Sequence, residues 1–398
     1  MSAVEVGDVQ HGKVGWFELF YDLVIVAAIG YAAHTFAEHP SWALSLWIAA
    51  WTLIVFLLWS LTMLHHNLFP GNSPVRQALV LVQMFALVIA ALGAVADEGL
   101  SNATAFGAFW VTFGSVAAMY ALTARRPGAA GVTSRILAIT TGLGALVLTT
   151  GLLLSNDAPW TLDGWPVWIL GVGMAVTAVP LLLVVGRVAD VLDRAHLSER
   201  LGQIVIIVLG ESFMSLVAAL GGRPTIPNPL FLVITFLVVF AIWTLYFSSV
   251  LPAGPPAEVS RLRAWLLAHW LLMFGAVSAA AGFSALTLIP FGTRPIEIGS
   301  EWTTLPLACV MAAFTLLTWL GSPRGSVLAR THLIATIALV ALAVIGMTIT
   351  PGGEAWEIVA GSAIVMADAI VSVRRQRPHH LTRRGVETRS SGSGPSPS

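Results

Sequence analysis

The sequence has little charge and almost no cysteine. Asp, Glu, Lys and Arg make up 10% of its 398 residues, whereas soluble domains average about 25%. Because Cys309 is the single cysteine and lies in an apolar stretch, a disulfide within the chain and a cysteine-based metal site are excluded. The Walker loop, the dinucleotide fingerprint, H-E-x-x-H and G-x-S-x-G are also absent. These absences argue against a set of soluble enzyme domains.

Apolar residues dominate instead. They make up 57% of the chain and form twelve stretches, most of them close to the length of about 20 residues that crosses a bilayer as a helix. The stretches do not alternate in polarity as barrel strands do. The sequence therefore predicts an all-α polytopic membrane protein with about 12 transmembrane helices. We expect these helices at residues 16–36, 42–64, 76–96, 103–123, 134–155, 166–186, 200–220, 229–250, 262–286, 302–320, 328–349 and 354–373.

The basic residues predict the orientation of these helices. Of the 20 Lys and Arg residues, 18 fall in the N-terminus, the even-numbered connections or the C-terminus, and two, Arg223 and Arg294, fall on the opposite side. Since basic residues gather on the cytoplasmic side, both termini are predicted to be cytoplasmic. No cleavable signal peptide is expected, because the first 15 residues are polar and the first apolar run contains Glu18 and Asp22.

The chain reads as two repeats of six helices. FLLWSL at residues 56–61 matches FAIWTL at residues 240–245, 184 positions later. Similar offsets separate Gln83 from His269, Trp168 from Trp356, and Arg187 from Arg375. Six helices per repeat give both repeats the same orientation and predict a pseudo-twofold axis along the membrane normal. We expect a cytoplasmic N-terminus at 1–15, repeats at 16–190 and 191–374, and a disordered basic cytoplasmic tail at 375–398.

Two acids begin the first apolar stretch. Glu18 and Asp22 are four residues apart, which places them on one face of a helix. Such a pair repels unless a cation, a proton or an arginine lies between the carboxylates. The two acids are therefore candidates for an ion pathway, and the alternative is an interhelical ion pair that fixes packing. Candidate basic partners at cytoplasmic helix ends are Arg76, Arg200 and Arg263.

Glu211 lies near the middle of an apolar helix, between Gly210 and Ser212. An ionised side chain at the bilayer centre costs at least about 2.5–3.5 kcal/mol on insertion scales. The surrounding Leu, Ile, Val and Phe residues offset this cost, because each contributes about −0.3 to −0.6 kcal/mol. An intramembrane acid of this kind is by default a candidate for function. The alternative is a protonated Glu211 that donates one structural hydrogen bond.

Three more ionisable residues complete the set. His269, two turns into its helix, fits either a proton relay or a buried neutral ring with one hydrogen bond. Glu199 and Asp368 are candidates for structural ion pairs, the latter with Arg374 or Arg375 at the interface. Because their helices all enter from the cytoplasm, we predict that four residues meet in the cytoplasmic half of the axis: Glu18, Asp22, Arg200 and His269.

At these residues the chain resembles a known family. WFELFYDLV at residues 16–24 is similar to the ELF-aromatic-DLV opening of bacterial low temperature requirement protein A (LtrA), with Tyr21 where a Phe is common. ERLGQIVIIVLGES at residues 199–212 resembles the ER-x-G…IIVLGES segment of that family, and His269 falls where the family carries a histidine in an apolar helix. The resemblance implies a multi-pass protein of the bacterial inner membrane, first associated with growth in the cold.

Three functions fit these observations. A transporter or channel for protons, a cation or a small solute would use Glu18, Asp22, Arg200, Glu211 and His269, because buried charges in large polytopic folds mark pathways. An intramembrane lipid-modifying enzyme would need paired acids or a metal cluster. A structural or cold-adaptation protein would use the acids to lock helices. We expect no cofactor, no metal and no nucleic-acid partner. The expected partners are the lipid bilayer, an unidentified small ion or solute, and a second copy in a homo-oligomer.

Overall fold

The computed structural model describes residues 15–38, 41–71, 73–95, 102–154, 165–220, 228–287, 300–321, 325–349 and 355–376. In these ranges the chain forms α-helices joined by short turns, and no strand occurs in them. The predicted N-terminal segment and tail lie almost entirely outside the described residues, and so do Arg223 and Arg294.

Twelve α-helices follow one another along the chain. They are α1 (Trp16–Glu38), α2 (Trp42–Leu68), α3 (Pro74–Val95), α4 (Asn102–Thr123), α5 (Gly128–Leu154), α6 (Trp165–Val188), α7 (Arg194–Leu220), α8 (Pro229–Leu245), α9 (Val259–Thr287), α10 (Thr304–Gly321), α11 (Gly325–Ile349) and α12 (Ala355–Gln376). A π-helical turn, η1 (Tyr246–Val250), and a 3-10 turn, η2 (Leu251–Ala253), continue α8, and a 3-10 turn, η3 (Ser300–Trp302), precedes α10.

Each of the twelve predicted stretches corresponds to one of these helices. Ten helical segments, on α2–α6 and α8–α12, are long and apolar enough to cross a membrane. The prediction of an all-helical polytopic membrane protein is therefore confirmed. The caps follow local sequence: Ser41 accepts a hydrogen bond from the Leu44 amide before α2, and Asn228 accepts one from the Leu230 amide before α8. Both side chains satisfy amides that the first helical turn leaves free.

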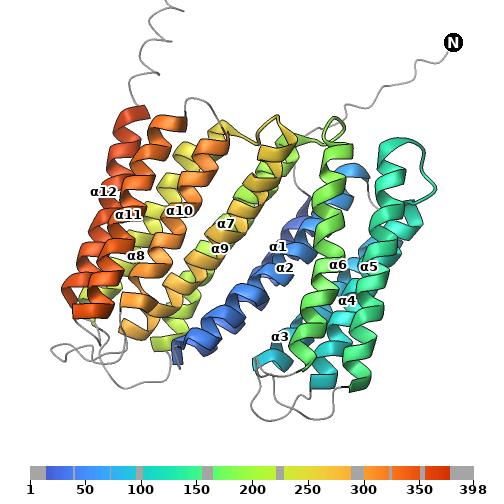
Figure 1. Cartoon of the computed structure of the whole chain (residues 1–398), viewed down its shortest axis with the longest axis horizontal. Coiled ribbons are helices and arrows are strands. Elements are labelled where there is room, and N and C mark those ends of the chain that lie inside the picture. The colour runs from blue at the N-terminus through green and yellow to red at the C-terminus, as the bar shows by residue number, and fades with distance from the viewer. Residues whose placement is uncertain are drawn as a thin grey trace, which may run out of the picture.

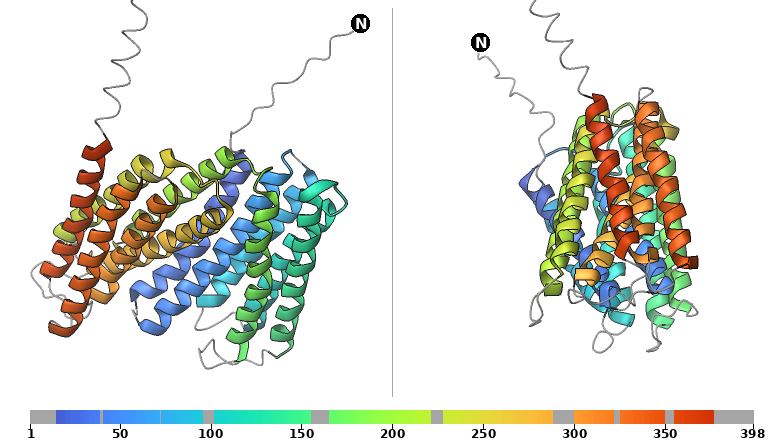
Figure 2. Two further views of the ribbon diagram at one scale, coloured as in Figure 1. Left: turned by 45° about the horizontal axis from the view of Figure 1, so that its top comes forward. Right: turned by 90° about the vertical axis from the view of Figure 1, so that its left-hand side faces the viewer.

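The helices form two groups with a shared centre (Figure 1). At one end α3–α6 stand side by side, and at the other end α8 and α10–α12 do the same. Between these groups run α1, α2, α7 and α9. Here α1 packs against α7 and α9 as well as against α2 and α3, so the central helices join the two halves of the chain. The two further views in Figure 2 show the same arrangement from other sides.

One face of the bundle collects the basic residues. Successive helices alternate in direction, so odd-numbered helices begin, and even-numbered ones end, at the upper side of Figure 1. Long-range bonds hold this side together: Asn67 donates to the Asp193 carbonyl at 2.8 Å, and Arg194 to the Pro256 carbonyl at 2.6 Å. The twelve arginines that the structure describes all lie in these helix ends or the adjoining turns. We call this side the basic face.

Candidate functional site

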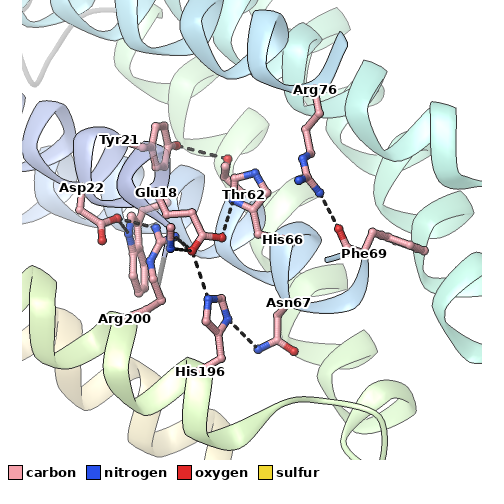
Figure 3. A network of polar contacts seen from close by, with 12 residues as sticks. Glu18, Tyr21, Asp22, Thr62, His66, Asn67, Phe69, Arg76, His196 and Arg200 are labelled. Atoms are coloured by element: carbon pink, nitrogen blue, oxygen red, sulfur yellow. Dashed lines mark hydrogen bonds and ion pairs between the residues drawn. The ribbon is translucent and has the colours of Figure 1, made fainter. Parts of the chain in front are cut away.

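Arg200 of α7 binds both acids of α1. Its Nη2 donates to Oδ1 of Asp22 at 2.5 Å, and its Nη1 lies 3.3 Å from Oε2 of Glu18 (Figure 3). The side chains of Arg200 and Asp22 are 0% exposed, whereas that of Glu18 is 17% exposed. The four-residue spacing on α1 places both carboxylates toward α7, as the sequence predicted. We call Glu18, Asp22 and Arg200 the acid–arginine cluster.

Trp59 of α2 covers the buried part of this cluster. Its indole Nε1 donates to Oδ1 of Asp22 at 2.7 Å, and the Arg200 guanidinium lies 5.9 Å from its ring centroid. A desolvated guanidinium over a tryptophan face is stabilised by the ring quadrupole. Trp59 therefore contacts both charges of the buried pair, one through its N–H group and one through its ring.

Two histidines approach Glu18 from the basic face. His66 of α2 places Nδ1 3.5 Å from one carboxylate oxygen, and His196 of α7 places Nε2 3.2 Å from the other. Asn67 fixes this corner, because its side chain bonds both the amide and the carbonyl of Asp193 just before α7. Figure 3 shows Glu18 between His66, His196 and Arg200. The carboxylate of the partly exposed Glu18 thus contacts three basic side chains.

The acid–arginine cluster taken alone carries one more negative charge than positive, since two carboxylates face one guanidinium. The Arg76 guanidinium also interacts electrostatically with Glu18 and His66 and offsets part of this charge. Protonation of Glu18 or of a histidine changes the charge of the site by one further unit. Across the described part of the chain, no group of three or more His, Cys, Asp and Glu side chains is placed to hold a metal ion. Glu18, His66 and His196 are the groups around the buried pair that can take up or release a proton.

Hydrogen bonding in the cluster is incomplete. Within the described residues, Oδ2 of Asp22 and Nε of Arg200 are buried without a hydrogen-bond partner, and Nη1 of Arg200 has only its ion pair with Glu18. A purely structural ion pair is stabilising only when its remaining polar atoms are satisfied. Each unsatisfied group costs about 1–3 kcal/mol. These atoms favour a site whose partners change over a rigid lock between helices.

Glu211 of α7 faces α1, as Arg200 does. It lies eleven residues further along α7, which is three turns and nearly the same side of the helix. The half-buried Glu211 packs against Gly30 of α1, where a β-carbon would overlap its carboxylate. No hydrogen bond or ion pair joins Glu211 to another residue that the structure describes. The α1–α7 interface therefore carries the acid–arginine cluster near the basic face and a single acid deeper in the bundle.

His269 does not join the cluster. Its Nδ1 lies 2.8 Å from the Trp265 carbonyl, and its Nε2 lies 3.1 Å from the hydroxyl of Tyr246. Because a carbonyl only accepts, the neutral ring carries its proton on Nδ1 and accepts from Tyr246 at Nε2. The prediction that four residues meet is corrected to three. The previous turn of α9 supplies the Trp265 carbonyl to Nδ1, and the π-helical turn η1 supplies the Tyr246 hydroxyl to Nε2, so both ring nitrogens have partners other than the acids of α1.

Comparison with known proteins assigns this chain to a family. A sequence model described as "Bacterial low temperature requirement A protein (LtrA)" matches residues 13–371. The chain belongs to the LtrA family. It is also similar to the uncharacterized protein RA0937 of Rhizobium meliloti (strain 1021), with 26% identity over 288 residues, which cover 68% of this chain and 67% of the relative. No solved structure matches the chain.

The predicted structural ion pairs of this LtrA protein have other partners in the structure. Arg76 donates to the Phe69 carbonyl at 2.5 Å, and Arg263 donates to the Leu183 carbonyl at 3.2 Å. Arg76 reaches the C-terminal end of α2, where carbonyls have no partner in their own helix, and Arg263 reaches across to the last turns of α6. Glu199, beside Arg200, makes no hydrogen bond or ion pair with any described residue.

Asp368 is also paired differently from the prediction. It binds Nδ1 of His332 on α11 at 2.6 Å, and both side chains are buried. Arg374 and Arg375 lie about two turns away along α12, roughly 10 Å, whereas α11 packs beside α12 and places His332 at the carboxylate. The partner of Asp368 comes from the neighbouring helix α11. The spacing of residues along α12 does not show which group that helix places beside the acid.

The sequence did not predict Trp59, His66 and His196 as members of this site, nor His332 as the partner of Asp368. One signal was available, since Trp59 lies in the repeated hexapeptide at residues 56–61. The histidines gave none. A histidine near a helix end reads as an interfacial residue, and its partner becomes apparent only when the helices are packed.

Proposed function

We propose that this LtrA protein transports protons across the membrane, alone or together with a cation or small solute, along the α1–α7 interface. The observation that carries the proposal is that two carboxylates share one buried guanidinium, and that one of them, Glu18, also contacts two histidines with which it can exchange a proton. Glu18 is open to the basic face, and Asp22 lies one turn deeper. A proton arriving at Glu18 weakens its ion pair with Arg200 and leaves the arginine bound to Asp22.

The deeper part of the route supports the same proposal. On α7, Gln203 lies about one turn beyond Arg200, and its buried Oε1 has no hydrogen-bond partner in the described chain. Next comes an apolar layer that includes the buried Ile25 and Ile29 of α1, followed by Glu211. Polar groups on either side of a dry layer are the arrangement of a gated pathway. A proton crosses such a layer only when the helices on either side move.

The placement of the cluster between the two halves supplies that motion. The acids come from α1 and the arginine from α7, the first helices of the two proposed repeats. In transporters built from repeats, the substrate site lies at the repeat interface and alternating access is largely rigid-body rocking of the halves. Rocking of α1 against α7 would exchange the partners of Arg200, because the guanidinium contacts both carboxylates at once.

We expect the purified protein in liposomes to carry protons, and Glu18→Gln to reduce that flux at least tenfold. Glutamine keeps the size of the side chain and removes the charge that attracts a proton to this carboxylate and its two neighbouring histidines. The measurement is the fall in pH inside the vesicles under an imposed membrane potential, reported by an enclosed pH-sensitive dye. Glu199→Gln is the matched control, since Glu199 is on the same face of the bundle and bonds to no described residue. Equal flux in protein-free and protein-containing liposomes would overturn the proposal.

We also propose that the protein lies in the bacterial inner membrane with the basic face toward the cytoplasm. All twelve described arginines lie on that face, and basic residues near membrane helices stay on the cytoplasmic side. Alkaline phosphatase fused after Arg375 is then expected to be inactive, and green fluorescent protein fused there to be fluorescent. Activity of the phosphatase fusion would reverse the topology and the direction assigned to the pathway.

A further inference from the structure

An apolar groove of about 410 Å³ lies outside the acid–arginine cluster, between α2 and α6. Its walls extend from Ala50 to Leu64 on α2 and from Gly171 to Val185 on α6, and Ser60 is the one polar side chain among its lining residues. About 14 residues of helix rise about 21 Å. The groove therefore runs along roughly two thirds of the hydrocarbon thickness of a bilayer, which is about 30 Å.

A second groove, of about 440 Å³, lies between α8 and α12. Its lining positions correspond to those of the first groove. On the inner helix, Phe56 and Ser60 are matched 184 positions later by Phe240 and Thr244. On the outer helix, Val185 is matched 188 positions later by Val373. An accidental gap between helices has no reason to recur at the same positions of both halves, so the two grooves are a repeated feature of the fold.

One arginine stands at the basic-face end of each groove. At the first groove, Arg263 of α9 lies one turn before the lining Leu266 and Leu267 and crosses Gly186 to reach α6. At the second groove, Arg374 of α12 contributes to the lining. Each groove thus combines apolar walls, which are longer in the first groove, with a cation at one end.

Both arginines are available to a ligand. Neither Arg263 nor Arg374 forms an ion pair with an acid that the structure describes. The acid closest in sequence to Arg374, Asp368, is already bound to His332. Arg263 donates one hydrogen bond to the Leu183 carbonyl, which leaves other donors of its guanidinium for a phosphate.

We propose that the two grooves are equivalent binding sites for an anionic phospholipid from the leaflet at the basic face. One acyl chain lies along each groove, and the phosphate binds the arginine at its end. An anionic headgroup fits better than a zwitterionic one, because no ammonium group opposes the guanidinium group. The sites are independent of the proton pathway, since no residue of the acid–arginine cluster lines either groove.

Native mass spectrometry of the full chain in detergent with equimolar phosphatidylglycerol and phosphatidylcholine tests this proposal. We expect two retained phosphatidylglycerol molecules per chain. Arg263→Gln and Arg374→Gln are each expected to weaken one of the two sites by roughly fivefold, because an arginine near the headgroup contributes about 1 kcal/mol. The control is Arg330→Gln, which removes a charge from the same face at the start of α11.

A groove-filling substitution tests the acyl-chain part separately. Ala175→Trp places a large side chain in the first groove, and Ala341→Trp places one on the exposed side of α11, away from both grooves. The first is expected to remove one bound lipid and the second none. Equal retention of the two phospholipids would overturn the proposal. It would also be overturned if Arg330→Gln matched the groove arginines, or if Ala175→Trp kept both lipids.

Discussion

Arg200→Gln is expected to lower the free energy of unfolding by about 3–5 kcal/mol, because it leaves the buried Asp22 carboxylate without its partner. Trp59 then provides a single hydrogen bond to an otherwise unpaired charge. The double variant Arg200→Gln/Asp22→Asn removes both charges and should recover most of this loss. Thermal unfolding in detergent measures the stability of the two variants, and flux into liposomes measures their function.

The double variant separates the pathway from a structural lock. If the cluster only holds α1 against α7, the double variant regains stability and supports growth and proton flux at the wild-type level. If Arg200 exchanges between Glu18 and Asp22 during transport, the double variant is stable and inactive. The single variant Asp22→Asn completes a double-mutant cycle with the other two variants and the wild type. The coupling energy between Arg200 and Asp22 can then be calculated without assuming additivity. A double variant as unstable as Arg200→Gln alone would contradict the assignment of the buried pair.

Glu211→Gln is expected to leave the melting temperature nearly unchanged and to abolish proton flux. Glutamine preserves the shape that packs against Gly30 but cannot ionise. Insertion into the membrane becomes easier, since an ionisable group is removed from the apolar centre of α7. A structural donor would behave in the opposite way: glutamine would be nearly silent, and Glu211→Ala would destabilise the protein by about 1–3 kcal/mol.

Gly30 provides the control for this second prediction. Gly30→Ala introduces a β-carbon that overlaps the Glu211 carboxylate, and overpacking of this kind costs about 1–3 kcal/mol. Combining it with Glu211→Ala relieves the overlap, so the double variant should be more stable than Gly30→Ala alone. Flux at the wild-type level in Glu211→Gln would remove this residue from the mechanism, whatever its effect on packing.

The pairing of residues on one helix was predictable from spacing. Glu18 and Asp22 share a face because four residues make about one turn, and an unpaired buried acid requires a cation, which limited the partners to a few arginines at helix ends. The actual choice of Arg200 over Arg76 and Arg263 depended on packing. Both of the others reach backbone carbonyls on helices that happen to end beside them.

What the sequence determined by itself is the class and the layout of this protein: an all-helical polytopic chain, its twelve helices, its basic face and its membership of the LtrA family. These follow from long apolar runs, sparse charge and local motifs, whose physical basis is contained within single helices. The tertiary structure decided which charges meet. His196 contacts Glu18, His332 binds Asp368, and His269 binds Tyr246. Side chains reach only a few ångströms, so each binds the group that a neighbouring helix places at the same depth.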